Sequence, residues 1–386
     1  MIIELHLLQS FPTSNLNRDD MGQPKSVTFG GAIRGRVSSQ SLKRSARNLF
    51  PEVGLAEEET AKRTKRLLQQ AANRLAPEGE EAGDEDRTVV REALRQMGFG
   101  VNAATDLTEY LLFVKATAVD TLAAHCAEHR ERLLKDAAKR EKNPKGSEKK
   151  KPDGDTLKVA RTILDARRSV DIALFGRMIA DNKDFNVDAA SQVAHAISTH
   201  AVAVEFDFYT AVDDLKPDAE AGADMIGTVD FNAACYYRYA NLDLGQLRRN
   251  LFGAVAELAA EDEDLLKRAA SAWLNAFVRA VPSGKQNSMA ALTQPDTLLA
   301  VVRDSGSWNL ANAFLNPVAG TGVMETSTRL MWEHFSRLRG FYGDREIRAV
   351  AMASLSGDLD ALEVPREEQA DTLAGFSQKV LGAVGG

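Results

Sequence analysis

The sequence lacks most of the features that would place it in an oxidised or membrane-spanning class of protein. Its 386 residues include only two cysteines, Cys126 and Cys235, so there is neither a disulfide framework nor the cysteine spacing of a zinc site. No apolar run approaches the roughly eighteen residues needed to cross a bilayer. The N-terminal MIIELHLLQSF lacks the basic start of a signal peptide and predicts a half-buried first strand. We therefore expect a cytoplasmic protein.

Recognisable catalytic motifs are also missing. The chain contains no GxGxxG or GxxxxGK[ST] phosphate-binding spacing and no GxSxG nucleophile motif. His195 and His200 lie near Asp207, Asp213 and Asp214, but a five-residue separation is not a helical metal-ligand spacing. We expect structural roles for these histidines and predict no catalytic residue, no metal and no cofactor, hence no enzyme.

A basic segment, residues 16–47, stands out in an otherwise acidic chain. It holds two acidic residues and seven basic ones: Arg18, Lys25, Arg34, Arg36, Lys43, Arg44 and Arg47. Residues 1–50 carry a net charge of +4. Because the whole chain has a net charge of −7, the remaining residues carry −11. Solvated charge, a nucleic-acid backbone site and a small-anion site all stay open. The mixture of Arg and Lys with Ser, Gln and Gly suits sequence-independent contacts to phosphate and sugar.

The rest of the chain predicts an α+β protein. Ser38 or Ser39 can cap a helix that turns Lys43, Arg44 and Arg47 away from its apolar side. The pair Gly30-Gly31 predicts a backbone turn or a close approach. Residues 56–165 have a charged, helical texture, including 107–140, and predict a helical insertion. Residues 169–180 have a strand-like texture.

Two extended runs, residues 201–214 and 228–244, predict a long hairpin or a projecting β-arm. In such an arm Phe206 and Phe208 share one face and Tyr209 lies on the other. These rings are either ordinary core residues or an apolar wedge that stacks on or separates bases.

Several ordered motifs resemble one protein family. NLNRDDMGQPKSVTFGGAIRGRVSSQSLKR, VDIALFGRM, HAISTHAVAVEFDFYTAVDDL, YYRYANLDL, VPSGKQ and ANAF are similar to segments of the backbone subunit of type I-E CRISPR Cascade, the CasC family. The likeness covers most of the chain in the same order, except for the helical insertion, which matches only in length and texture.

The resemblance implies a palm with a modified RRM-like, or ferredoxin-like, fold formed by residues 1–55 and 166–386. It also implies a helical fingers insertion at 56–165 and a β-arm thumb at about 200–228. Copies of such a subunit polymerise head-to-tail along one CRISPR RNA (crRNA), together with other Cascade subunits, and present this guide for pairing with target DNA.

The same resemblance assigns candidate RNA-binding residues. Those on the guide backbone are Arg18, Lys25, Ser38, Gln40, Lys43 and Arg47. Met178 is expected against the bases, and Phe208, Tyr209 and Thr210 at the thumb, where the family has a Trp-Phe pair in place of Phe208-Tyr209.

Charge alone, without a motif, suggests a contact with target DNA in the lysine-rich segment 139–151, which otherwise predicts a solvated polar loop. Its candidate residues are Lys139, Lys142, Lys145, Lys149 and Lys150. Two other functions remain open for the chain: a guide-processing endoribonuclease with His195 or His200 as general base, and a generic single-stranded RNA-binding scaffold.

Overall fold

The computed structural model describes residues 1–142, 154–179, 185–211 and 225–384. They form two compact units. The first unit comprises Met1–Gly54, Ser191–Gly245 and Glu263–Gly386, and the second comprises Leu55–Ala190 and Gln246–Asp262. The predicted helical insertion of 56–165 lies inside the second unit, which extends further along the chain.

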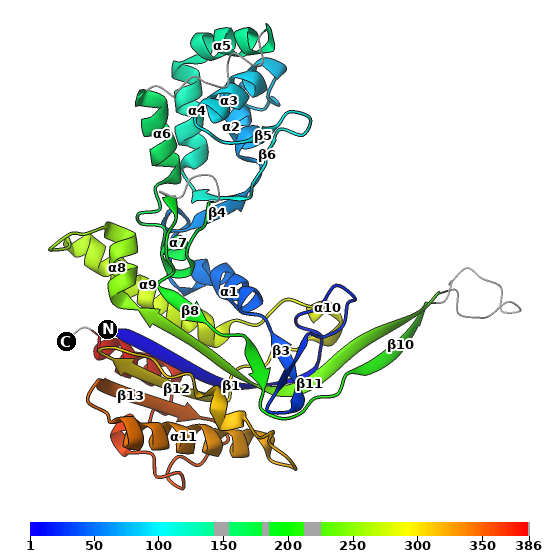
Figure 1. Cartoon of the computed structure of the whole chain (residues 1–386), viewed down its shortest axis with the longest axis vertical. Helices are drawn as coiled ribbons and strands as arrows, with labels where there is room; N and C mark the ends of the chain where they lie inside the picture. Colours follow the sequence, from blue (N-terminus) through cyan, green and yellow to red (C-terminus); the bar gives the residue numbers. More distant parts are fainter. Residues whose placement is uncertain (143–153, 180–184, 212–224, 385–386) are drawn as a thin grey trace, which may run out of the picture. The chain divides into compact units, whose positions relative to one another are not determined.

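The first unit is built on an antiparallel sheet of nine described strands (Figure 1). The main path of the sheet has the order β13-β12-β1-β11-β9-β3-β2, and β8 and β10 also pair with β11. The strands are β1 Ile2–Ser14, β2 Ser26–Phe29, β3 Ala32–Val37, β8 Ser191–Val193, β9 Ala196–Ser198, β10 Glu205–Ala211, β11 Met225–Asp243, β12 Thr297–Arg303 and β13 Ile347–Ser354.

Helices cover this sheet. Its α-helices are α1 Ser39–Asn48, α9 Ala260–Arg279, α10 Gln286–Met289, α11 Val323–Tyr342 and α12 Leu373–Gly382. Met331 and Phe335 of α11, one helical turn apart, pack in one core with Leu8 of β1 and Tyr237 of β11. None of the described helices combines the length and apolar character that a membrane span requires.

Strand β11 belongs to two parts of the first unit. Near its start it pairs with β10, from Ala211↔Met225 to Glu205↔Phe231. Further along it pairs with β1, and this ladder runs to Ile2↔Asp243. One continuous strand therefore forms one side of a two-stranded arm and then enters the centre of the sheet (Figure 1).

Strand β1 is buried on both faces. Its sequence had predicted a half-buried strand, with only one face buried. It lies between β11 and β12, so its polar residues Glu4 and His6 are buried as well. Tyr239 donates a hydrogen bond to Glu4 (3.2 Å), and Nδ1 of His6 bonds the hydroxyl of Tyr237 (2.9 Å). Burial raises the pKa of Glu4 to about 7 and lowers the pKa of His6 to about 3. These partners allow polar side chains inside a central strand.

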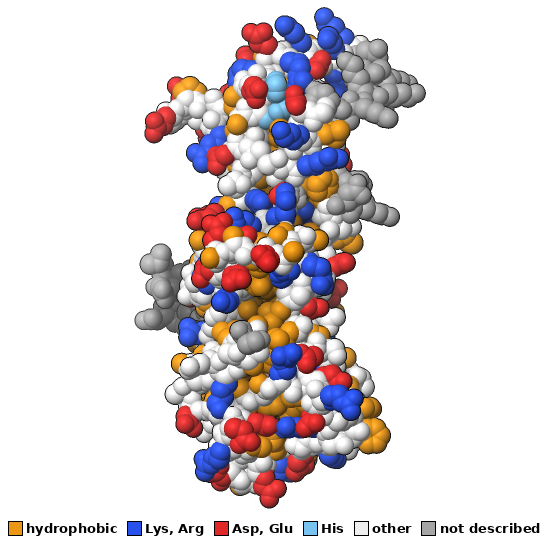
Figure 2. All heavy atoms as spheres, turned by 90° about the vertical axis from the view of Figure 1, so that its left-hand side faces the viewer, with side chains coloured by type: hydrophobic (Ala, Val, Ile, Leu, Met, Phe, Trp, Pro, Cys, Tyr) orange, Lys and Arg blue, Asp and Glu red, His pale blue; other side chains and the backbone are white. Residues whose placement is uncertain are grey.

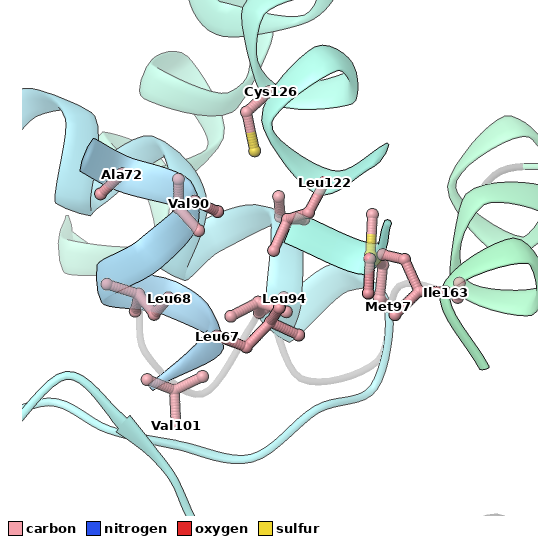
Figure 3. Packing of buried hydrophobic residues seen from close by; sticks show 14 of the residues in the cluster. Leu67, Leu68, Ala72, Val90, Leu94, Met97, Val101, Leu122, Cys126 and Ile163 are labelled. Carbon is pink, nitrogen blue, oxygen red and sulfur yellow. The ribbon is translucent and has the colours of Figure 1, made fainter. Parts of the chain in front are cut away.

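The second unit is mainly helical. Its strands are β4 Ala61–Thr64, β5 Val101–Asn102, β6 Leu107–Thr108 and β7 Leu112–Lys115. Its helices are α2 Leu67–Leu75, α3 Asp84–Gln96, α4 Ala118–Glu128, α5 Arg130–Lys142, α6 Gly154–Leu164, α7 Val170–Phe175 and α8 Leu244–Phe252, the last of which starts at the end of the first unit. Apolar residues spaced by four, such as Val90 and Leu94 or Leu122 and Cys126, turn one face of each helix into a shared core (Figure 3).

Two predictions of secondary structure were wrong. Residues 170–175 form α7 instead of a strand. The prediction failed because a short, fully buried apolar run has no periodicity that distinguishes a helix from a strand. Its buried Asp171 accepts a hydrogen bond from the backbone N–H of Ala61 (2.8 Å). Within the predicted helix 107–140, Leu112–Lys115 forms β7, which pairs with β4. Its Leu-Phe-Val core suits a strand.

The turn of the β2–β3 hairpin confirms the predicted role of Gly30-Gly31. Both residues adopt the left-handed backbone conformation, with φ of 60° and 76°. A Cβ added to Gly30 would lie 1.6 Å from the carbonyl oxygen of Leu315, whereas one added to Gly31 would meet nothing within 4 Å. Gly30 therefore serves both a turn and a close approach, and Gly31 serves the turn alone.

We predict that Gly30→Ala destabilises the protein much more than Gly31→Ala. Both variants force alanine into the left-handed region, at a cost of about 1 kcal/mol. Gly30→Ala must also push the backbone at Leu315 away, which brings its total to about 3 kcal/mol. Thermal and urea unfolding of the two variants measure the difference, and equal losses of stability would show that the hairpin does not depend on this contact.

Candidate nucleic-acid interface

The loop of residues 15–24, at the start of the basic segment, is held by its own short polar side chains. The buried Asn15 donates from Nδ2 to the carbonyl groups of Gly22 (3.0 Å) and Asp230 (2.8 Å). Oδ1 of Asp19 accepts from the backbone N–H groups two and four residues further on, each at 2.9 Å. This acidic side chain is thus used to shape the loop.

The same loop is tied to the N-terminus of α1. Oδ1 of Asn17 accepts from the backbone N–H of Ser38 (2.8 Å). Ser38 is the N-cap, and its Oγ accepts from the backbone N–H of Ser41 (3.3 Å), which confirms the predicted cap. Leu42 and Ala46 bury the inner side of α1. The positive end of the helix dipole consequently lies beside the loop, where it favours an anion.

A groove of about 1040 Å³ lies between these elements, entirely within the first unit. Gln40, Arg44 and Asn48 line it from α1, and their spacing of four residues places them on one helical face. The remaining lining comes from other residues of the 38–49 segment and from residues 16–22 and 279–294. Three arginines line the groove against two acidic residues: Arg18, Arg44 and Arg279 against Asp19 and Asp20.

Gly284 fixes the third side of the groove. An added Cβ there would lie 2.4 Å from the carbonyl oxygen of Leu16, so the 282–285 turn packs directly on the loop. The next residue, Lys285, has a φ of 53°, a conformation that L-residues rarely adopt. This close contact sets the position of the segment that follows Arg279.

The structure brings only some of the predicted RNA-binding residues into this groove. Arg18, Ser38 and Gln40 line it. Lys43 and Arg47 belong to α1 but not to the groove lining, and both are half-buried. Lys25 forms part of a different cluster.

Lys25 lies with Arg36 and His195 beside the β2–β3 hairpin. Nη1 of Arg36 is 3.0 Å from Nδ1 of His195. Because a guanidinium can only donate, Nδ1 accepts and Nε2 carries the proton. Partial burial, followed by the positive charges of Arg36 and Lys25, lowers the pKa of His195. This histidine stays neutral within a basic cluster.

Arg34 is a basic residue of the segment that cannot reach a ligand. Its side chain is fully buried. Its guanidinium donates to the carbonyl groups of Ser198 (2.9 Å) and Phe314 (2.9 Å). Its guanidinium therefore holds the sheet to the 3₁₀ helix Leu310–Phe314. Its charge is not part of the exposed basic surface that the count of charges in residues 16–47 implied.

His200 has a structural role. Its Nδ1 donates to the carbonyl group of Ala201 (2.8 Å), and its Nε2 accepts from the backbone N–H of Cys235 (3.2 Å). Both ring nitrogens are therefore occupied by the backbone. Asp213 and Asp214, which were considered with it, lie outside the described residues.

The arm formed by β10 and the start of β11 exposes aromatic side chains. Phe206 and Phe208 are each 64% exposed, and their rings meet edge-to-face with centroids 5.9 Å apart. Tyr209 points to the other face, where it is paired with Gly227; a Cβ on this glycine would lie 2.4 Å from the tyrosine ring. Thr210 is also exposed. The predicted sharing of faces is confirmed, and these rings are not core residues.

The second unit holds the other candidates. Met178 is 87% exposed. Lys139 lines a hollow of about 700 Å³ and forms an ion pair with Asp136 (3.6 Å), while Lys142 is exposed at the end of α5. Lys145, Lys149 and Lys150 lie outside the described residues.

The charges of the molecule are otherwise mixed. Figure 2 shows basic and acidic side chains intermingled over the face that it draws. A chain with a net charge of −7 therefore depends on a local arrangement, such as the groove, to attract an anionic polymer.

The RNA-binding residues that the resemblance implies leave out two arginines of the groove, Arg44, which belongs to the basic segment, and Arg279. The first had a signal, because it lies one helical turn after Gln40. The second had none, because Arg279 ends α9 and reaches the groove only through the tertiary fold.

Comparisons with known proteins give one family and two similar solved chains. The family model for CT1975-like protein matches residues 3–378. A solved chain of a "CRISPR RNA-guided surveillance complex, pre-nicking" has 32% sequence identity and a TM-score of 0.82, over 99% of this chain and 100% of that one. A solved chain of a "CRISPR RNA-guided surveillance complex" has 27% identity and a TM-score of 0.71, over the same shares. Among curated proteins, none matches.

We predict that the ring of Tyr209 stabilises the arm by covering Gly227. Tyr209→Ala should increase hydrogen exchange of the paired amides of 205–211 and 225–231 by up to about fivefold, the value expected for loss of one cross-strand pair. Tyr209→Phe keeps the ring and should leave exchange unchanged. Equal exchange in the wild type and in Tyr209→Ala would contradict this role.

Proposed function

The chain belongs to the CT1975-like protein family, and on that premise we propose that it is a non-catalytic backbone subunit of a type I-E CRISPR surveillance complex. In this proposal it binds crRNA, polymerises along it with further copies and other Cascade subunits, and presents it in the cytoplasm for pairing with target DNA. The 32% identity over nearly the whole length of a chain from an RNA-guided surveillance complex supports this assignment.

The observation that carries the proposal is the groove between α1 and the loop of residues 15–24. It combines Arg18, Arg44 and Arg279 with the N-terminus of a capped helix. Such a site holds phosphates without reading base sequence, which suits a subunit that leaves recognition to base pairing.

The order of the central strands supports an RRM-like palm. The path β12-β1-β11-β9 is antiparallel, with α1 between β1 and β9 and α9 between β11 and β12. In chain order this is the β-α-β-β-α-β arrangement of ferredoxin-like folds, with the second unit inserted after α1. We assign this sheet to the palm, the helical unit to the fingers and the β10–β11 arm to the thumb.

The exposed arm supports a role between successive copies. It presents aromatic rings to solvent on both faces, which a protein acting alone has little reason to expose. A contact between an arm and a different surface of the next copy is head-to-tail and generates a filament. In this proposal Phe208 acts on the guide as the base wedge, and Lys139 and Lys142 remain candidates for contact with the target strand.

The hydrogen bonds of His195 and His200 support a non-catalytic role. A general base needs a free lone pair within reach of its proton. The acceptor nitrogen of His200 is occupied by Cys235, and that of His195 by Arg36. Incubation of the purified protein with precursor RNA distinguishes an endoribonuclease from a non-catalytic subunit. An endoribonuclease would cleave the RNA, and His200→Ala would abolish the cleavage.

A generic RNA-binding scaffold is the other alternative. It would use the same groove without a guide system. Sequencing the RNA recovered with the protein from its cells separates the two functions. Repeat-derived guides support the proposal, and heterogeneous RNA supports the scaffold.

We predict that reversing the charges of Lys43 and Arg47 to glutamate abolishes assembly on guide RNA while the monomer stays folded. The two changes shift the charge of the α1 surface by −4, which repels phosphate. Size-exclusion chromatography with guide RNA and sister subunits measures assembly. Arg337→Glu with Arg345→Glu is the matched control, since both arginines are exposed and lie outside the basic segment. Normal assembly of the Lys43 and Arg47 variant would contradict the proposal.

We also predict that Phe208→Ala spares assembly but changes the pattern of displaced guide bases. The exposed ring is the part of the arm best placed to separate stacked bases. Nucleotide reactivity probing of the assembled guide records the spacing of reactive positions. Val204→Ala, another exposed apolar position near the arm, serves as the control. If Phe208→Ala leaves the reactivity pattern intact, the wedge lies elsewhere.

A further inference from the structure

The loop of residues 304–309, which connects β12 to the 3₁₀ helix Leu310–Phe314, lies against a buried ion pair of the first unit. Glu4 of β1 is 0% exposed and Arg303 of β12 is 4% exposed. Oε2 of Glu4 lies 3.7 Å from Nη1 of Arg303, too far for a hydrogen bond. Neither of these two atoms has a hydrogen-bond partner among the described residues. A buried carboxylate with one oxygen left unbonded is costly to keep charged.

Two residues of the loop contact this pair. The backbone N–H of Trp308 donates to Oε1 of Glu4, and the centroid of the Trp308 ring lies 3.8 Å from Cζ of Arg303. Nε of Arg303 donates to the carbonyl group of Ser305 (3.2 Å). Apart from Trp308, the residues of the loop are exposed. Such a segment opens locally at a lower free energy than the sheet beneath it.

Both ends of the loop are fixed. At its start, Asp304 pairs with the side chain of Arg348, and its backbone N–H donates to the carbonyl group of Glu346 (2.8 Å). After the loop, the backbone N–H of Leu310 donates to the hydroxyl of Tyr237 (2.8 Å), and Leu310 is fully buried. Opening is therefore confined to the residues between these points, and it brings water to the ion pair without unfolding the sheet.

The charge of Glu4 depends on whether the loop is closed. Burial raises the pKa of its carboxyl from 4.5 to about 7, although the N–H of Trp308, the charge of Arg303 and the hydroxyl of Tyr239 act in the opposite direction. In the open loop, water solvates the carboxylate and its pKa returns toward 4.5. The closed loop thus binds the proton more tightly than the open one. Closure is strongest below about pH 4.5, weakens as the pH rises to about 7, and is constant beyond.

The other ionisable groups that face Glu4 are His6 of the same strand, Tyr237 and Tyr239 of β11, and Arg303 of β12. Burial lowers the pKa of His6 to about 3. Burial also raises the pKa of both tyrosines well above their ordinary value. Neither the histidine nor the tyrosines therefore change charge between about pH 5 and pH 9.

Helix α11 carries a further titratable group near the loop. Its Phe335 and Tyr342 contact the ring of Trp308. Its His334 is half-buried, and partial burial, followed by the charge of Arg337, lowers the pKa of this histidine. His334 is therefore the alternative source of a pH effect and provides a control.

We propose that the loop of residues 304–309 is a pH-sensitive strap, closed over Glu4 when this residue is protonated and open more often once it is ionised. The proton goes to Oε2, which accepts no hydrogen bond from the described residues. The bonds of Trp308 and Tyr239 to Oε1 therefore persist in the closed form. The strap needs no RNA and shares no residue with the groove.

Amide hydrogen exchange of the RNA-free protein between about pH 5 and pH 9 tests this inference. The intrinsic rate at each pH divided by the observed rate gives a protection factor, which removes the base catalysis of exchange itself. The protection of the Trp308 N–H should fall about fortyfold between pH 5 and 7 and only about twofold between pH 7 and 9. It should also stay below the protection of the β1 amides, because the strap opens without the sheet.

Three variants identify the titrating group. Glu4→Gln carries no charge at any pH and should make the protection of Trp308 independent of pH. Tyr239→Phe keeps the ring but removes a hydrogen bond to the ionised carboxyl, so the plateau should begin at a higher pH than in the wild type. His334→Gln should leave the wild-type profile unchanged. If thermal unfolding shows that Glu4→Gln does not fold, the wild type and Tyr239→Phe decide.

Four results would overturn the inference. One is a flat wild-type profile between pH 5 and 7. Another is equal protection of Trp308 and the β1 amides at every pH, since the loop then opens only with global unfolding. The others are a pH dependence that survives Glu4→Gln or vanishes in His334→Gln, and a plateau that Tyr239→Phe does not move. Because RNA is absent from the experiment, none of these results bears on the proposed function.

Discussion

The antiparallel ladder between β1 and β11 is the constraint on which the rest of the first unit depends. It runs from Ile2↔Asp243 to Phe11↔Ala234 and continues after a bulge to Ser14↔Asn232. Because a slip of one residue would turn Glu4 and His6 to the opposite face of the sheet, their buried hydrogen bonds with Tyr239 and Tyr237 specify the register. Beyond this ladder, the same β11 strand carries the arm, and β1 leads directly into the loop of residues 15–24.

The groove follows from that ladder. Asn15, the residue after β1, is bonded to the carbonyl group of Asp230 on β11, so the loop starts from a fixed point. Asn17 then connects the loop to the cap of α1. The arginines of the groove are gathered from three separate segments by these contacts. A chain with excess negative charge can thus offer a confined positive surface, where the local field rather than the net charge attracts a polyanion.

Much of this arrangement was accessible from the sequence, and the exceptions have physical reasons. The helix cap at Ser38, the glycine turn and the paired faces of the arm are local properties, and all three are confirmed. The burial of Arg34 and the position of Arg279 in the groove could not be predicted from local sequence. Both depend on contacts between residues far apart in the chain. The short helix at 170–175 was missed because complete burial removes the alternation that distinguishes strand from helix.

The central claim is that the surface around the groove holds an RNA backbone. Ultraviolet cross-linking of the protein to its bound RNA, followed by mass spectrometry of the linked peptides, tests it most directly. The account predicts cross-links within residues 16–48 and 279–294, with a separate group in the β10–β11 arm. Cross-links confined to α11, β13 and α12 would contradict it.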